Sequence, residues 1–191
     1  MRLLVSFALV LSMSGSEIER AQQVARGRDS ERQQFHRRYV FPLTDPAVTQ
    51  IEVVTEFRRL VLITEEHIFR GDWLFSRSVK SAEEALASSR GRVTMRATVR
   101  FNPLNTYITP PPYLLAVTPN ATGAPVALET QVTPQFSAPF KARGKMVSSL
   151  TGATLEADAA SAQLGQTTLA VAVLLDGKEL ARVTVELGKL D

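Results

Sequence analysis

The chain has no cysteine and only two histidines among its 191 residues. The first absence excludes disulfide bonds, thiol catalysis and cysteine-ligated metal sites. The second leaves only His36 and His67, which are too few for a histidine-rich metal site. We therefore expect no bound metal, and a fold whose stability comes from packing alone.

The chain also carries little net charge. The formal net charge is only +3, although the isoelectric point is near 9.5. A protein that depends on nucleic acid normally carries a much larger basic excess. We expect no nucleic-acid partner.

No hydrophobic run is long enough to cross a bilayer, which takes about 20 apolar residues. The apolar run at residues 3–11 follows the basic Arg2 and precedes small residues at positions 12–16. This order is typical of a cleavable signal peptide, and a buried N-terminal strand is the alternative. We predict a signal peptide at residues 1–16, a periplasmic or secreted mature protein, and no transmembrane span in the mature chain.

The familiar catalytic motifs are missing too. The sequence contains no nucleophile elbow, no phosphate-binding glycine loop and no dinucleotide fingerprint, so we expect no cofactor. Glu66 and His67 are the only acid–base pair that we nominate, and neighbouring helix residues point about 100° apart. An ion pair between Glu66 and Arg70 is the alternative, and a non-enzymatic protein is favoured.

Residues 17–44 are rich in arginine, glutamine and glutamate, and few of them are apolar. This composition predicts a flexible or loosely helical lead-in. Arg32, His36, Arg37 and Arg38 could contact an anionic surface, but a solvated tether is the favoured interpretation.

Residues 45–191 are predicted to form a single globular domain that starts with a helical hairpin at 45–90. Asp45 and Pro46 suit a helix start, and apolar residues then recur at steps of three and four. The alternative is two strands at 51–54 and 60–63, because β-branched residues are frequent there. Gly71 and Asp72 separate this first helix from a second one.

Residues 91–191 are predicted to be antiparallel β-structure. Apolar and polar residues alternate from 93 to 101, and residues 113–117 form a short strand candidate. Asp176-Gly177 predicts a two-residue hairpin turn that pairs Val173 with Leu180 and buries strand 169–175 on two sides. The fold class is therefore α+β, with the helical hairpin packed on an antiparallel β-sandwich or layered sheet.

Five residues are candidate binding residues. Arg92, Arg96 and Arg100 lie on one face of the predicted strand at intervals of about 13 Å, so they form a basic stripe for an acidic lipid, glycan or protein. The alternative is pairing with carboxylates on a neighbouring strand. Tyr107 and Tyr113 flank a proline-rich segment and present rings either to a partner or to the core edge.

The sequence thus favours an exported, non-enzymatic module that binds or assembles with another protein through an exposed sheet edge. A carrier of an apolar or lipid-like ligand between helices and sheet is the second hypothesis, because strand 169–175 is apolar on both faces. An enzyme that uses the Glu66–His67 pair is the third.

Overall fold

A computed structural model describes residues 13–105, 107–142, 144–164 and 168–190. Most of the predicted signal peptide, residues 1–12, lies outside the described residues. The helices are α1 (Gly15–Ala25), α2 (Asp29–Arg37), α3 (Glu56–Phe69) and α4 (Val79–Leu86), with short 3-10 turns η1 (Phe75–Arg77), η2 (Ala87–Ser89), η3 (Ser161–Gln163) and η4 (Leu187–Lys189). The strands are β1 (Val40–Pro42), β2 (Val48–Val54), β3 (Arg92–Arg100), β4 (Tyr113–Pro119), β5 (Val126–Ala127), β6 (Gln131–Phe136), β7 (Phe140–Ala142), β8 (Lys145–Val147), β9 (Leu150–Ala160), β10 (Thr168–Leu175) and β11 (Lys178–Glu186).

Two antiparallel sheets form the larger part of the molecule. The first has strand order β1-β2-β3-β9-β6 and the second β11-β10-β4-β5. Their inner faces share one hydrophobic core, in which Met95, Leu155, Leu115 and Val171 have almost no solvent exposure. The predicted α+β class, with N-terminal helices and C-terminal antiparallel sheets, is confirmed.

The strand predicted from strict alternation is confirmed as β3. Val93, Met95, Ala97 and Val99 all point into the core, whereas the alternate residues lie on the outer face of the first sheet. Alternation is a reliable signal here because β3 is a central strand with one covered face.

The Asp176-Gly177 turn is also confirmed, and both residues have positive φ, at 50° and 75°. The register predicted beyond the turn is wrong. Val173 pairs with Ala181 instead of Leu180, because a bulge lies between Val173 and Leu174. The extra residue in β11 shifts every later pair by one position.

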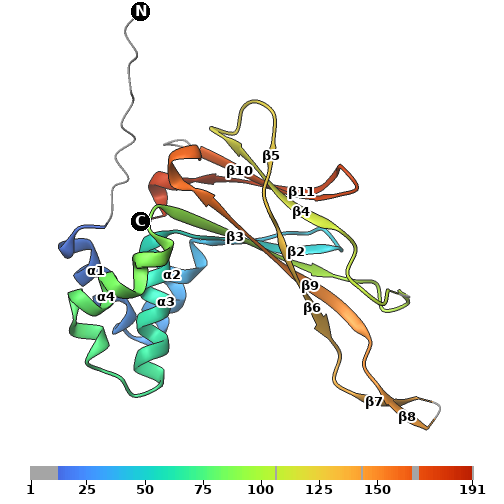
Figure 1. Ribbon diagram of the computed structural model, residues 1–191, viewed down its shortest axis with the longest axis horizontal. Coiled ribbons are helices and arrows are strands. Elements are labelled where there is room, and N and C mark those ends of the chain that lie inside the picture. The colour runs from blue at the N-terminus through green and yellow to red at the C-terminus, as the bar shows by residue number, and fades with distance from the viewer. Residues whose placement is uncertain (1–12, 106, 143, 165–167, 191) are drawn as a thin grey trace, which may run out of the picture.

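The helices form a second apolar cluster at one end of the sandwich (Figure 1). Helix α1 supplies Ile18, Ala21 and Ala25 to this cluster, and α3 supplies Leu60 and Val61. Residues 17–44, for which the sequence predicts a flexible or loosely helical lead-in, contain most of α1 and all of α2 and β1. The packed face of α1 is hard to recognise in the sequence because two of its four buried residues are alanines and a third is Gln22.

The helix predicted from Asp45 onward is wrong over its first turns, where β2 lies instead. Val48, Ile51 and Val53 all face the core, and a bulge between Val48 and Gln50 lengthens the first interval to three residues. A bulge thus imitated helical spacing, so the alternative strand at 51–54 was the better interpretation. Helix α3 starts only after Thr55, whose hydroxyl accepts a hydrogen bond from the Arg58 backbone N–H.

A two-stranded ribbon, β7–β8, projects from the end of the sandwich opposite the helices (Figure 1). It continues the β6–β9 hairpin, because the Ser137 N–H donates to the Ser149 carbonyl at 2.8 Å and the Ser149 N–H donates to Ser137 Oγ at 3.0 Å. We call residues 136–150 the arm.

Candidate functional site

The predicted arginine stripe lies on the outer face of β3, but two of its three charges are already paired. Arg96 sits directly opposite Glu156 on β9, with Nε 2.7 Å from Oε2. Arg92 lies 3.8 Å from an oxygen of Asp158. The alternative of cross-strand pairing thus describes these two residues.

Arg100 differs because Gly152 stands opposite it. A Cβ atom at position 152 would lie 2.3 Å from the Val99 carbonyl oxygen, so a side chain there would require the backbone to shift. No carboxylate of the described residues lies within ion-pair distance of the Arg100 guanidinium. Arg100 is therefore the unneutralised member of the stripe.

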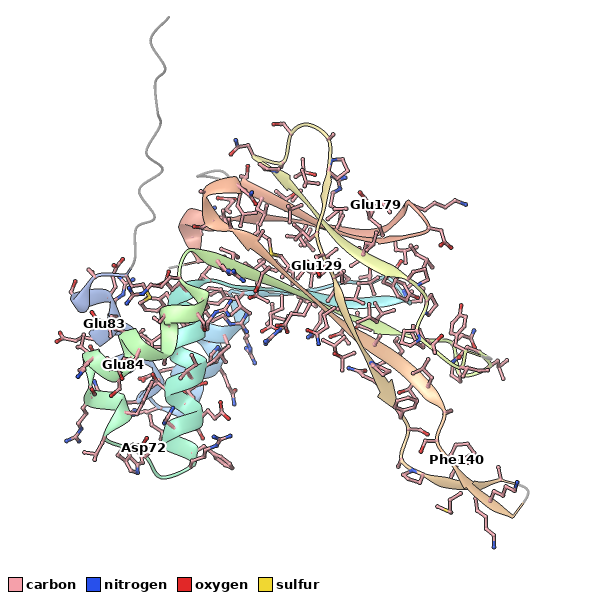
Figure 2. All side chains as sticks on the ribbon, in the orientation of Figure 1. Asp72, Glu83, Glu84, Glu129, Phe140 and Glu179 are labelled. Atoms are coloured by element: carbon pink, nitrogen blue, oxygen red, sulfur yellow. The ribbon has the colours of Figure 1, made fainter. Side chains whose placement is uncertain are left out.

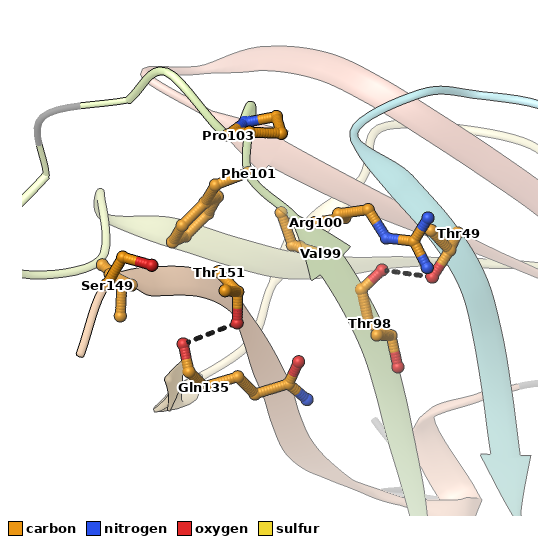
Figure 3. A pocket seen from close by; sticks show the side chains of 10 residues that line it. Thr49, Thr98, Val99, Arg100, Phe101, Pro103, Gln135, Ser149 and Thr151 are labelled. Atoms are coloured by element: carbon orange, nitrogen blue, oxygen red, sulfur yellow. Dashed lines mark hydrogen bonds between the residues drawn. The ribbon is translucent and has the colours of Figure 1, made fainter. Parts of the chain in front are cut away.

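A surface pocket of about 440 Å³ lies beside Arg100, with Phe101, Gln135 and Leu150 among its lining residues (Figure 3). Two of its hydroxyls are already engaged: Thr49 donates to the Thr98 carbonyl at 3.2 Å, and Thr151 donates to the Gln135 carbonyl at 3.1 Å. Arg100 is the one charged residue among the described residues that line this pocket. Because a single guanidinium is all that could bind an anionic group, the pocket alone is a weak site.

The two tyrosines differ in environment. Tyr113 is buried and stacks on Phe101 with ring centroids 6.1 Å apart, and burial raises the pKa of its hydroxyl. Tyr107 is half exposed and meets the edge of Phe101 at 5.3 Å. Tyr113 thus belongs to the core, and only Tyr107 offers a surface for contact.

Glu66 and His67 face different partners. Glu66 pairs with Arg70 at 2.5 Å, as the alternative interpretation expected. His67 Nδ1 lies 2.9 Å from Asp72, and its ring stacks on Phe75 at 3.8 Å. The pair joins the last turn of α3 to the residue that follows Gly71, and the hydrogen bond with His67 lowers the pKa of Asp72.

Sequence reasoning missed a second histidine–glutamate pair. His36 Nε2 lies 3.0 and 3.1 Å from the two Glu65 oxygens, and Arg32 approaches the same carboxylate at 3.7 Å. No local signal could find this pair, because α2 and α3 bring together residues 29 positions apart. It ties α2 to α3 and borders no cavity described above.

A buried charge joins the helices to the first sheet. The Arg58 side chain is only 3% exposed, donates to the Val53 carbonyl at 2.9 Å and forms an ion pair with Glu52. Its guanidinium also lies 4.9 Å from the centre of the Tyr39 ring. Burial lowers the pKa of Arg58, and the nearby Glu52 charge opposes that shift.

The most extended feature that can accept a partner is the outer edge of β11. This edge strand has nine residues and no proline, whereas β1 has three residues, β5 has two, and β6 contains Pro134. Proline removes a backbone donor, so β6 is the poorer template for another strand. Arg182 and Thr184 of β11 are exposed.

A groove of about 330 Å³ lies along this edge, where the two sheets meet. Phe41 of β1, Thr184 and Glu186 of β11, and Leu190 after β11 are among its lining residues, together with Arg38 and Lys189. An extended segment paired with β11 would find here a place for one of its alternate side chains.

In the part of the chain that the structure describes, no three histidine, aspartate or glutamate side chains gather to hold a metal ion. No helix of that part has the length and apolar character needed to cross a bilayer. The chain matches no protein-family model, no curated protein and no solved structure.

Proposed function

We propose that the protein is an exported, non-enzymatic module that binds or assembles with another protein by pairing an extended partner segment with β11. The nine-residue, proline-free outer edge of β11 carries this proposal. Backbone groups on that side supply the affinity of strand addition, which needs no particular partner sequence.

The groove beside β11 supplies selectivity. Phe41 contributes partly exposed apolar surface, and Lys189 is paired with Glu186 at 2.7 Å. Arg38 forms no ion pair with the other described residues, so it favours a partner segment that places a carboxylate at the groove.

The signal peptide predicted from the sequence supports a periplasmic or secreted location, where exported modules meet their partners. Removal of residues 1–16 would take away the Ser14 cap of α1 and the contact of Met13 with the helical cluster, but it would keep the buried face of this helix. Its first buried side chain, Ile18, lies beyond that point, and its other buried residues follow later in the helix.

The packing offers less support for a ligand carrier. Both faces of strand β10 are buried: Leu169 and Val171 lie in the shared core, and Ala170 on the opposite face is also covered. Its double-sided apolar character is thus explained by packing.

Photo-crosslinking in the exporting cell tests the proposal. Benzoylphenylalanine in place of Arg182 or Thr184 is expected to yield one dominant adduct with another protein. The control places the same probe at Lys80, an exposed residue of α4, and at Gln135 on the proline-containing edge strand β6. The proposal is overturned if the β11 positions yield no adduct, or if all four positions yield the same adducts.

A further inference from the structure

The arm carries apolar side chains that no other part of the described protein covers. Phe136 is 57% exposed, Phe140 48% and Met146 67%, and Val147 is also exposed. None of these residues belongs to the hydrophobic core of the sandwich. Exposed apolar side chains that add nothing to the core are typical of a surface that contacts something outside the chain.

These apolar side chains occupy both faces of the ribbon. Phe140 is paired with Val147, so these two lie on one face, whereas Met146 is paired with Lys141 and lies on the other. A protein surface that covered one face would leave the other in water. A lipid phase surrounds both faces at once.

The charge of this region has one sign. Between Glu129 and Glu156 the sequence has no acidic residue, but it has Lys141, Arg143 and Lys145. Lys141 and Lys145 belong to the ribbon strands and are exposed. Lysine stems extend along apolar surface while their ammonium groups reach polar headgroups.

We propose that the arm binds the surface of an anionic lipid bilayer. Its aromatic and apolar side chains enter the boundary between headgroups and acyl chains, and its lysines contact anionic headgroups. The ribbon does not cross the membrane, because a two-stranded ribbon leaves edge backbone groups that hydrocarbon cannot satisfy.

The shape of the molecule suits this contact. Figure 2 places Phe140 on the arm, well away from the sandwich, and the ribbon continues beyond it, so the arm can reach a flat surface before the sheets do. The edge of β11 lies in the other sheet and remains free to hold a protein partner. This inference therefore stands independently of the proposed function.

Vesicle co-sedimentation of the full chain is the first test. We expect binding to vesicles of phosphatidylcholine with phosphatidylglycerol, weak binding to phosphatidylcholine alone, and a decrease with added salt. The double change Lys141→Gln with Lys145→Gln should weaken partitioning about 25-fold, from about fivefold for each lysine near an anionic surface. Lys80→Gln with Lys178→Gln removes the same charge elsewhere and should leave partitioning unchanged.

A second pair of double variants tests the contribution of the apolar side chains to vesicle binding. Phe140→Ser with Met146→Ser should abolish most binding, whereas Leu104→Ser with Ile108→Ser, which removes exposed apolar side chains from another loop, should not. Far-UV circular dichroism verifies that all variants fold.

Fluorescence gives a second readout, because Trp73 is the single tryptophan. Phe140→Trp in a Trp73→Phe background should shift its emission to the blue on anionic vesicles only. Equal binding to neutral and anionic vesicles, equal effects of arm and control changes, or an unshifted emission would each overturn the proposal. So would recovery of an acidic protein on the arm without vesicle binding.

Discussion

The arginines of this chain differ in whether they are buried, paired on the surface or exposed without a carboxylate partner. Arg58 is held at the junction of helix and sheet by Glu52, the Val53 carbonyl and the Tyr39 ring. Arg96 and Arg92 are neutralised by β9, and only Arg100 of the stripe is left for a partner. The sequence predicted the common face of the three arginines but not their different pairing, because that depends on which residues of β9 stand opposite.

Replacement of Arg58 by alanine should lower the free energy of unfolding by about 3 kcal/mol, because it leaves the Glu52 carboxylate without its buried partner. Urea unfolding measures this loss. Arg70→Ala, which breaks the exposed pair with Glu66, should cost about 0.5 kcal/mol or less. Equal losses for both variants would contradict the assignment of a structural role to Arg58.

At the scale of elements, sequence patterns identified strands better than helices. β3 and the hairpin around Asp176-Gly177 were predictable, since alternation and a positive-φ turn are local signals. The start of α3 was misplaced because the bulge in β2 changed the spacing of core residues. The packed face of α1 was not predicted, because it consists of Ile18, two alanines and Gln22.

The first turn of α1 should make stability depend on pH in the unprocessed chain. The Ser14 backbone N–H donates to the Glu17 carboxylate at 2.7 Å and lowers the pKa of Glu17. Because the folded pKa is depressed, this stabilisation is complete above the ordinary glutamate pKa of about 4.3 and is lost as the pH falls through the lowered value.

Thermal unfolding of the unprocessed chain should therefore show a difference between wild type and Glu17→Gln at neutral pH that shrinks in acid. Ser14→Ala should cost about 1 kcal/mol in the same chain. Neither contact can form after cleavage behind residue 16, so a processed chain that retained Ser14-dependent stability would show that the predicted cleavage position is wrong.

At the scale of the whole molecule, two apolar clusters are joined at few points. Phe35 of α2 packs against both, with its ring 5.0 Å from Tyr39 and 5.9 Å from Phe57. The sequence predicted the order of helices and sheets but not this junction, because its residues come from segments that no local pattern connects.

Phe35→Ala should lower the free energy of unfolding by about 2 to 3 kcal/mol and weaken the coupling between the clusters. We expect faster amide hydrogen exchange in α1 and α3 than in β3 and β10, which pack within the sandwich core. Leu104→Ser is the control, because that side chain is almost fully exposed. Uniform acceleration throughout the protein would show that the two clusters unfold as one unit.

The glycine opposite Arg100 also limits how this surface can evolve. Since position 152 has no room for a side chain, no single substitution there can introduce a carboxylate to neutralise the guanidinium without disturbing the strand. A carboxylate that neutralises Arg100 must therefore come from another position around the pocket, such as Thr49 or Gln135, or the charge is lost by changing Arg100 itself.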